Sequence, residues 1–316
     1  MRPVCVLGLG LIGGSVLKAA TRAGREAFGA TLEPVADPRV EPTVTAALER
    51  AARTDALVVV AVPLPAVDDV LREVAIHAPA CLLTDVVSVK QPVADAVTKR
   101  LPGTRYAGGH PMAGKSASGW EAATETLFDG AAWVVTTDED TPRDAWRAAA
   151  ELALACGAQV VPTTVREHDA AVARISHLPH IMAAVLAATG ADGGSLALSL
   201  AAGSFGDGTR VMMTRPELVL AMCEGNRGQL LSAVDEALGR LGAARGALAS
   251  TGGLAATVRA GHEGRQALED LRNADREEFP IDLTDPEAFE SLRDLGTAGG
   301  RVLRLEGDTA IAALPA

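Results

Sequence analysis

A short apolar strand that runs directly into a glycine-rich turn opens this chain. Residues 4–7 are apolar, glycines follow at Gly8, Gly10 and Gly13, and a stretch typical of a helix comes next. With this spacing the first glycine permits a tight turn, the second lets the backbone approach a pyrophosphate, and the third lets the helix pack on the strand. The helix N-terminus also attracts phosphate groups. The feature predicts the first unit of a dinucleotide-binding sheet, and the alternative is a glycine-rich turn without a ligand.

Residues 1–163 continue by alternating β-branched runs with Ala-rich stretches. Such alternation predicts a mostly parallel sheet with helices on both faces, the Rossmann-type doubly wound arrangement of the α/β class. Strands are expected at residues 3–7, 27–32, 56–62, 81–86, 105–108, 132–136 and 159–162. Helices are expected at residues 13–23, 44–52, 66–78, 90–100 and 143–156.

Strand signals nearly vanish after residue 165. Long apolar periodicities over 175–189, 216–241 and 243–248 indicate helices, so residues 164–280 are predicted to form an all-helical second domain. A polar, acidic stretch leads into Pro280. The remaining segment, 281–316, has room for one helix and one or two strands, and we expect it to pack on the helical domain as a small extension.

The nucleotide is expected to lie over the glycine-rich turn and the ends of the next two strands. We assign its contacts to Gly8, Gly10, Leu11, Ile12, Gly13, Thr31, Val62 and Pro63. An acidic side chain about 20 residues after the turn would bind the ribose 2′-hydroxyl of NAD. Glu33 stands near that distance, with Thr31 as the alternative occupant of the strand tip. No Arg or Lys lies between residues 31 and 36 to bind a 2′-phosphate, although Arg39 is near, so the cofactor is predicted to be NAD, with NADP as the alternative.

His110 and Ser88 each follow a predicted strand, and strand carboxyl ends are where open α/β sheets bind ligands. His110 stands between Gly109 and Pro111, which indicates a rigid loop rather than a helix or a central strand. Because the imidazole pKa lies near neutrality, His110 is a candidate proton acceptor, the alternative being a loop histidine bonded to backbone. Ser88 is a candidate for orienting that imidazole or touching the nicotinamide. It would serve equally as the N-cap of the helix that begins near residue 90.

Polar residues also interrupt the apolar helical domain. His177 and His180 are three residues apart and would share a helix face. We predict no metal site there, because the ligand spacing of known metal motifs is missing; burial with hydrogen bonds is as good an interpretation as catalysis. Arg210 ends a glycine-punctuated loop, where its guanidinium would clamp a carboxylate or pair with Asp207.

Charge and cysteine content exclude several classes of protein. The formal net charge is -11 and no basic cluster is present, so we predict no nucleic-acid binding. No uninterrupted apolar run has the length to span a bilayer, so we predict no membrane insertion. The 4 cysteines are widely spaced in apolar segments, which indicates free thiols in a reducing compartment. We therefore expect a cytoplasmic protein.

Several short motifs occur along the chain. They are residues 8–15 (Gly-Leu-Gly-Leu-Ile-Gly-Gly-Ser), 84–90 (Thr-Asp-Val-Val-Ser-Val-Lys), 110–114 (His-Pro-Met-Ala-Gly), 127–130 (Leu-Phe-Asp-Gly), 168–169 (His-Asp), 176–180 (Ser-His-Leu-Pro-His), 204–205 (Ser-Phe), 209–210 (Thr-Arg) and Asn226. In this order and approximate spacing they resemble the prephenate/arogenate dehydrogenase family of tyrosine biosynthesis. The resemblance spans residues 4 to about 240.

The resemblance implies an NAD(P)-dependent oxidative decarboxylation. Hydride leaves C4 of a cyclohexadienol ring and CO2 is lost as the ring becomes aromatic; prephenate would give 4-hydroxyphenylpyruvate, and arogenate would give tyrosine. It implies that His110 accepts the ring hydroxyl proton, Ser88 holds the imidazole, Arg210 binds a substrate carboxylate and His180 adds a polar contact. It also implies that the helical part is a dimerisation domain of a homodimer, with the active site between the domains.

The chain departs from the family pattern at two positions. Ser116 stands where the family often carries an acidic residue that pairs with the arginine, so Ser116 is assigned to the substrate site; Val219 stands where a tryptophan is common. Prephenate, arogenate and amino-deoxyprephenate therefore stay open as substrates. Two other functions are weighed: a hydroxyacid or imine reductase, which typically lacks the His-Pro-Met-Ala-Gly loop, and a non-catalytic nucleotide-binding protein, which would need neither His110 nor Arg210. The residues after Asp285 are too few for a complete regulatory domain.

Overall fold

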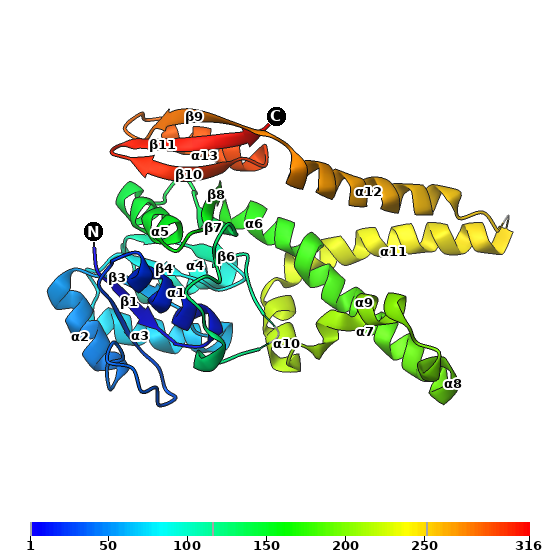
Figure 1. Ribbon diagram of the computed structural model, residues 1–316, viewed down its shortest axis with the longest axis horizontal. Coiled ribbons are helices and arrows are strands. Elements are labelled where there is room, and N and C mark those ends of the chain that lie inside the picture. Colours follow the sequence, from blue (N-terminus) through cyan, green and yellow to red (C-terminus); the bar gives the residue numbers. More distant parts are fainter. Residues whose placement is uncertain (1, 116, 251) are drawn as a thin grey trace.

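The computed structural model describes residues 2–115, 117–250 and 252–316 of the chain. An N-terminal α/β unit is followed by a helical unit and by a C-terminal unit of strands around one helix. The C-terminal unit folds back beside the N-terminal unit, while the helices project away from both (Figure 1). Ser116, predicted to belong to the substrate site, lies outside the described residues.

Five short parallel strands form the first sheet, in the order β2-β1-β3-β4-β5. They are β1 (Val4–Leu7), β2 (Ala27–Ala30), β3 (Leu57–Val60), β4 (Leu83–Asp85) and β5 (Tyr106–Ala107). Side chains along β1 alternate, because Val4 and Val6 join one hydrophobic cluster whereas Cys5 and Leu7 join another. This period of two gives the sheet an apolar layer on each face.

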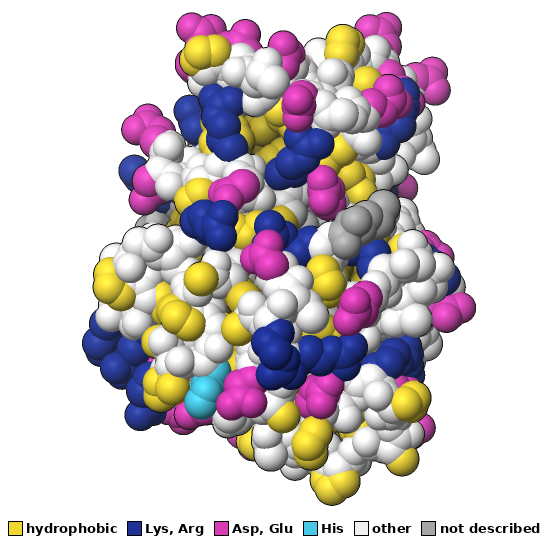
Figure 2. Space-filling view, turned by 90° about the vertical axis from the view of Figure 1, so that its left-hand side faces the viewer, with side chains coloured by type: hydrophobic (Ala, Val, Ile, Leu, Met, Phe, Trp, Pro, Cys, Tyr) yellow, Lys and Arg dark blue, Asp and Glu magenta, His cyan; other side chains and the backbone are white. Residues whose placement is uncertain are grey.

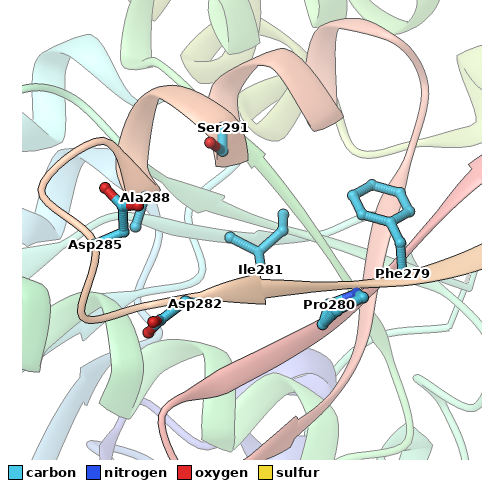
Figure 3. Close-up of a pocket in the computed structure, with 7 residues that line it drawn as sticks. All are labelled: Phe279, Pro280, Ile281, Asp282, Asp285, Ala288 and Ser291. Carbon is cyan, nitrogen blue, oxygen red and sulfur yellow. The ribbon is translucent and has the colours of Figure 1, made fainter.

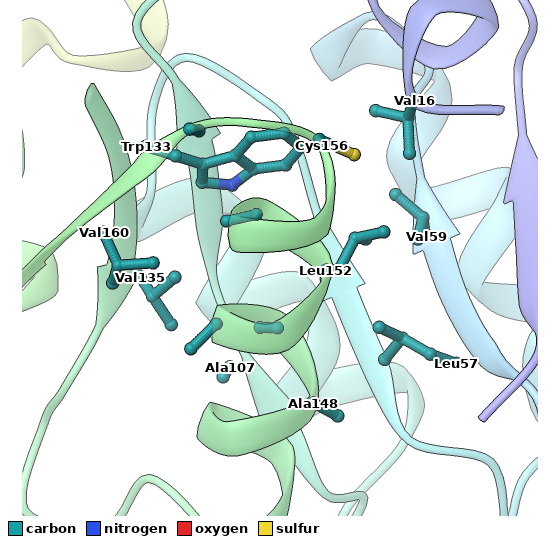
Figure 4. Packing of buried hydrophobic residues seen from close by; sticks show 14 of the residues in the cluster. Val16, Leu57, Val59, Ala107, Trp133, Val135, Ala148, Leu152, Cys156 and Val160 are labelled. Carbon is teal, nitrogen blue, oxygen red and sulfur yellow. The ribbon is translucent and has the colours of Figure 1, made fainter. Parts of the chain in front are cut away.

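Helices cover both faces of this sheet. They are α1 (Leu11–Arg22) and α5 (Arg143–Ala155) on one face, and α2 (Val44–Thr54), α3 (Val67–His77) and α4 (Gln91–Arg100) on the other. The short turn η1 (Leu64–Ala66) leads into α3. Figure 4 shows Leu152 of α5 between Val59 of the first sheet and Val160 of a second sheet. The predicted α/β class with helices on both faces of a parallel sheet is confirmed.

The chain leaves the first sheet after β5 and enters a second sheet of six strands, in the order β6-β7-β8-β10-β11-β9. Its strands are β6 (Gly109–Pro111), β7 (Ala132–Thr136), β8 (Gln159–Thr163), β9 (Arg276–Asp282), β10 (Arg301–Glu306) and β11 (Thr309–Pro315). β7 and β8 are parallel, and the other neighbours are antiparallel. The sequence predicted β7 and β8 as part of a single sheet, whereas the structure places them in this separate mixed sheet.

The C-terminal unit, which comprises β9 to β11 and α13 (Ala288–Thr297), packs on the N-terminal unit. The expectation that residues 281–316 pack on the helical domain is therefore wrong. Val302 of β10 pairs with Val160 of β8. A Cβ atom on Gly296 would lie 1.8 Å from the carbonyl oxygen of Pro162, so a glycine is needed where α13 approaches β8. These contacts join residues far apart in the sequence, which local patterns do not reveal.

The sequence did not predict the strand β9, because three of its residues are acidic and it includes Pro280. It forms the edge of the second sheet and pairs only with β11 among the described strands. At a sheet edge, a proline can face away from the ladder without leaving a central hydrogen bond unmade. Edge position therefore explains a strand with this composition.

A cavity of about 280 Å³ lies beside β9 and α13 (Figure 3). It is lined by Phe279, Pro280, Ile281, Asp282, Asp285, Ala288 and Ser291. The carboxylates of Asp282 and Asp285 accept hydrogen bonds from the backbone N–H groups of Thr284 and Glu287, both at 2.8 Å. These acidic groups therefore hold the turn after β9.

The helical unit begins with a capping box, in which Thr164 accepts from the backbone of Glu167 and the Glu167 side chain accepts from the backbone of Thr164. Its elements are α6 (Val165–Val172), the π-helical turn η3 (Ala173–His177), α7 (Leu178–Asp192), α8 (Gly194–Ser199), α9 (Gly203–Thr209), η4 (Arg210–Met213), α10 (Pro216–Gly225), α11 (Arg227–Ser250) and α12 (Ala255–Asn273). Within the continuous helical run Val165–Asp192, one 18-residue window has a mean hydropathy of 1.4, and 22% of that window is buried. The window resembles a membrane span by length and composition only, as core helices of soluble proteins also do.

Large apolar side chains are exposed across the helical unit. They include Val185, Leu196, Leu220, Leu241 and Val258. Exposed apolar surface of this extent marks a contact with another molecule. On the face of the protein in Figure 2, hydrophobic side chains are scattered between Lys and Arg side chains, and Asp and Glu side chains lie close to these basic groups.

Candidate active site

The turn between β1 and α1 leaves open space at a helix N-terminus. Gly8 has a φ of 96°, and a Cβ atom on Gly13 would lie 1.9 Å from the carbonyl oxygen of Gly8. Glycine at both positions therefore lets α1 pack directly on the turn. A Cβ atom on Gly10 would meet nothing within 4 Å among the described residues, and Gly10 is the N-cap of α1. Open space beside helix N–H groups fits a pyrophosphate.

The other predicted cofactor residues lie at the same edge of the sheet. Leu11 and Ile12 form the first turn of α1, Thr31 follows β2, and Val62 and Pro63 follow β3. Because β1, β2 and β3 are parallel neighbours, their carboxyl ends share this edge. All of these residues are partly or fully exposed. The residues predicted to contact the nucleotide therefore share one edge of the sheet.

Arg39, the candidate partner of a 2′-phosphate, is held by Asp37. Two guanidinium nitrogens of Arg39 donate to the two carboxylate oxygens of Asp37, at 2.8 and 2.6 Å. Hydrogen bonding from Arg39 lowers the pKa of Asp37 to about 2. A third guanidinium nitrogen donates to Thr21 Oγ1 at 3.1 Å. This engaged cation suits a ribose with a free 2′-hydroxyl better than one with a 2′-phosphate.

His110 lies in the short strand β6 and pairs with Val134 of β7. The prediction of a loop is therefore wrong. β6 is the edge strand of the second sheet, so Pro111 leaves no central ladder bond unmade. The strand fixes the backbone of His110 on one side, and the residue as a whole is largely but not fully buried.

A chain of three side chains begins at His110. Its Nδ1 atom lies 2.8 Å from His168 Nε2, and His168 Nδ1 lies 2.7 Å from Asp169 Oδ1. Burial, followed by the neighbouring charges of His168, Lys90 and His177, holds the pKa of His110 well below its usual value. Burial likewise lowers the pKa of His168. Both imidazoles are therefore neutral at physiological pH, and a neutral imidazole is the form that accepts a proton.

Asp169 joins this chain to the start of α4. Its carboxylate accepts from the backbone N–H groups of Lys90 and Gln91, each at 2.9 Å. The alternative role of Ser88 as the cap of this helix is therefore wrong, because a carboxylate from α6 satisfies the helix N-terminus. The backbone carbonyl of Asp169 in turn accepts from Asn226 Nδ2 at 2.7 Å. These bonds fix the helical unit against the end of the parallel sheet.

His177 is buried beside the same network. Its Nδ1 lies 3.1 Å from Asn226 Nδ2, and its Nε2 has no hydrogen-bond partner within the described chain. Burial lowers the pKa of His177 to about 4. Of the two interpretations weighed for this histidine, the structure favours a buried, hydrogen-bonded group.

A buried ion pair lies behind His110. The ammonium of Lys90 donates to a carboxylate oxygen of Asp85 and, at 2.6 Å, to the carbonyl oxygen of Gly109. The side chains of Lys90 and Asp85 are 0% and 1% exposed. The hydroxyl of Tyr106 donates to the other oxygen of Asp85 at 2.6 Å. The pair therefore holds the backbone immediately before His110.

The remaining predicted site residues lie on neighbouring elements. Ser88 is partly exposed in the segment between β4 and α4, and its hydroxyl makes no hydrogen bond within the described chain. His180 is partly exposed on α7, with Nδ1 2.8 Å from the carbonyl oxygen of Ser176. Arg210 is exposed in η4, which packs on α7, and forms no ion pair with Asp207 or another described residue.

Metal-binding side chains do not gather in the described parts of the chain, where no group of three or more His, Cys, Asp or Glu is placed to hold an ion. The residues that the sequence did not assign to the site are Asp85, Lys90, His168 and Asp169. Lys90 follows the strand end by five residues, and His168 adjoins Asp169, but neither spacing predicts burial or the partner.

A nucleotide cradle and a partly exposed neutral histidine, joined to a helical second unit, define a dinucleotide-dependent oxidoreductase. Two family models match the chain: the prephenate dehydrogenase nucleotide-binding domain over residues 37–162, and the prephenate dehydrogenase dimerization domain over residues 164–252. The chain therefore belongs to the prephenate dehydrogenase family.

Relatives and solved structures agree with this assignment. Prephenate dehydrogenase of Bacillus subtilis is 32% identical over 252 residues, which cover 74% of this chain and 66% of that protein. A proposed prephenate dehydrogenase of Corynebacterium glutamicum is 43% identical, with a TM-score of 0.88 over 95% of this chain and 98% of that one. Prephenate dehydrogenase of Aquifex aeolicus, solved with hydroxyphenyl propionate and NAD+, shares the fold at 21% identity, with a TM-score of 0.71 over 86% of this chain and 96% of that one.

Proposed function

We propose that this protein is an NAD-dependent prephenate dehydrogenase that produces 4-hydroxyphenylpyruvate and CO2. The observation that carries the proposal is His110, a largely but not fully buried residue whose neutral imidazole has Nδ1 engaged by His168. When bound in the cradle at Gly10, NAD+ supplies a hydride acceptor. The engaged state of Arg39 supports NAD over NADP.

The proposed reaction needs one proton acceptor that later returns its proton. As hydride leaves C4, the hydroxyl proton on that carbon passes to His110 and the C4–O bond becomes a carbonyl. The bond from C1 to the carboxylate then breaks, and its electron pair enters the ring. The ring oxygen regains the proton from His110, which completes the phenol. No proton is lost overall, so His110 ends each turnover neutral.

Arg210 and His180 supply the proposed substrate contacts. Arg210 is exposed and has no ion partner in the described chain, and a guanidinium of this kind binds a carboxylate through two parallel hydrogen bonds. His180 lies on α7, against which η4 packs. Ser88, between β4 and α4, would contact the imidazole or the nicotinamide.

Replacing Arg210 with alanine is expected to raise KM for prephenate by roughly 30- to 1000-fold, which corresponds to about 2–4 kcal/mol of lost charged hydrogen bonding. The value of kcat should change less, because the lost contact is present before and during the reaction. Steady-state kinetics measure both. The exposed Arg53 on α2 provides the control, since Arg53→Ala should leave KM unchanged. An unchanged KM in Arg210→Ala would assign the carboxylate to another residue.

The assembly that we propose is a homodimer formed through the helical unit. The family model for this region is a dimerization domain, and the exposed apolar side chains of α7, α8, α10, α11 and α12 lie in or next to it. A second copy would bury this surface. The four free cysteines are all buried, which supports the cytoplasm as the proposed location.

The assay that tests the function compares prephenate with arogenate, each with NAD+ and with NADP+. We expect reduction of NAD+ with prephenate, accompanied by release of CO2. Turnover of arogenate alone would redirect the same chemistry to tyrosine formation. Turnover of neither compound would exclude the proposed activity.

A further inference from the structure

We propose that His168 and Asp169 are positioning residues that hold His110 in one tautomer, so that Nε2 receives the substrate proton. The identity of the proton donor rests on the proposed function. The tautomer itself follows from the contacts of the three side chains.

Asp169 forms the inner end of the network that begins at His110. Its two oxygens accept hydrogen bonds from backbone N–H groups of Lys90 and Gln91, which can only donate. Although burial alone would raise the pKa of Asp169, hydrogen bonds from His168, Gln91 and Lys90 lower it. Asp169 is therefore a carboxylate that acts as an acceptor. The hydrogen between His168 Nδ1 and Asp169 Oδ1 must then belong to His168.

The tautomer of His168 determines the tautomer of His110. A neutral imidazole carries one N–H and one lone pair, so His168 with its hydrogen on Nδ1 presents a lone pair at Nε2. His110 Nδ1 lies 2.8 Å from that lone pair and must donate to it. Neutral His110 therefore carries its hydrogen on Nδ1 and keeps Nε2 free. The neutral histidine side chain in water favours the Nε2–H tautomer, so the protein imposes the Nδ1–H form on His110.

Burial and the basic groups around His110 favour the neutral ring before the reaction. His168 and His177 approach from the helical unit, and Lys90 approaches from the start of α4, with Asp85 paired to it. When Nε2 accepts a proton, the bond from Nδ1 to His168 becomes charge-assisted, and the Asp169 carboxylate stabilises the positive pair. Asp169 remains ionised throughout.

Two substitutions of His168 separate an acceptor from a space-filling side chain. Glutamine places an amide oxygen near the position of Nε2 and can still accept from His110 Nδ1, whereas leucine cannot. Glu167→Ala is the control, because Glu167 lies on the same helix and helps to cap it without touching His110. Any effect that comes only from a less stable α6 should therefore also appear in Glu167→Ala.

The first readout is the imidazole 15N spectrum of the whole protein near neutral pH. The chain has 6 histidines, so His110 is assigned by the signal that His110→Asn removes. We expect the Nδ1–H tautomer in the unmodified protein, in His168→Gln and in Glu167→Ala. His168→Leu should shift His110 toward the Nε2–H tautomer. A spectrum in which His168→Leu retains the Nδ1–H tautomer would overturn the inference.

The second readout is the division between kcat and KM. His168→Leu is expected to lower kcat roughly 10–100-fold, as for other residues that orient a functional histidine, with KM within about threefold of its original value. His168→Gln should recover part of kcat. Equal kcat in the leucine variant and the unmodified protein would overturn the positioning role. The tautomer is measured without substrate, so failure of the dehydrogenase assay and failure of this inference remain distinguishable.

Discussion

The His110→Asn variant is expected to lose on the order of 10²–10⁴ in kcat for prephenate, because asparagine can hold a hydrogen bond but cannot accept the ring hydroxyl proton. The effect should fall on kcat rather than KM, since Arg210 and His180 would still bind the substrate. Steady-state kinetics with saturating NAD+ measure this division. A kcat close to the original value would remove His110 from the proton transfer.

A matched histidine elsewhere controls for the substitution itself. His77 lies at the end of α3, 3.7 Å from Glu73, and His77→Asn should leave kcat unchanged. The pH profile adds a signature. Because burial and neighbouring charges lower the pKa of His110, the ring is already neutral at pH 6.5, and kcat/KM should stay level there and decline only at lower pH. A decline centred above that pH would contradict this assignment.

The cofactor cradle could be predicted from sequence because its geometry is local. Gly8, Gly10 and Gly13 lie within six residues, and their conformations follow from the turn and helix that they join. The alternation of Val4 and Val6 with Cys5 and Leu7 similarly places β1 in a sheet covered on both faces. Patterns of this kind depend on neighbours along the chain, which the sequence displays.

The network behind His110 could not be predicted, because it joins distant residues. His110 and His168 are 58 positions apart, and Asp169 lies 79 positions from the backbone N–H of Lys90. Glycine and proline beside His110 indicated a loop, since the sequence does not show that the strand lies at an edge. The prediction that the C-terminal unit packs on the helical domain failed for the same reason. Its contacts with the N-terminal unit join distant residues, as where Arg143 donates to the carbonyl of Leu283, 140 positions away. The network behind His110, the edge strand that contains His110 and the position of the C-terminal unit all depend on pairing between residues that are distant in the sequence.

The Lys90→Met variant is expected to lose about 3–5 kcal/mol in free energy of unfolding, because it leaves the carboxylate of Asp85 buried without its counter-charge. Methionine retains most of the apolar stem, so the change isolates the ammonium. The carbonyl of Gly109 also loses its donor, and Gly109 precedes His110, so kcat should decline as well. Urea unfolding near neutral pH measures the stability, and a loss under about 1 kcal/mol would contradict the importance of the pair.

Two further variants test whether charge imbalance, rather than altered packing, causes the lower free energy of unfolding expected for Lys90→Met. Lys99 is exposed on the same helix, so Lys99→Met should change stability by less than about 0.5 kcal/mol. Adding Asp85→Asn to Lys90→Met removes the uncompensated charge, and the double variant should be more stable than Lys90→Met alone. The amide oxygen can still accept from the Tyr106 hydroxyl or the backbone of Val87, which now donate to Asp85. A double variant less stable than the single one would indicate that Asp85 acts mainly through those neutral donors. The ion pair would then serve chiefly to hold Gly109, and with it the strand that carries His110.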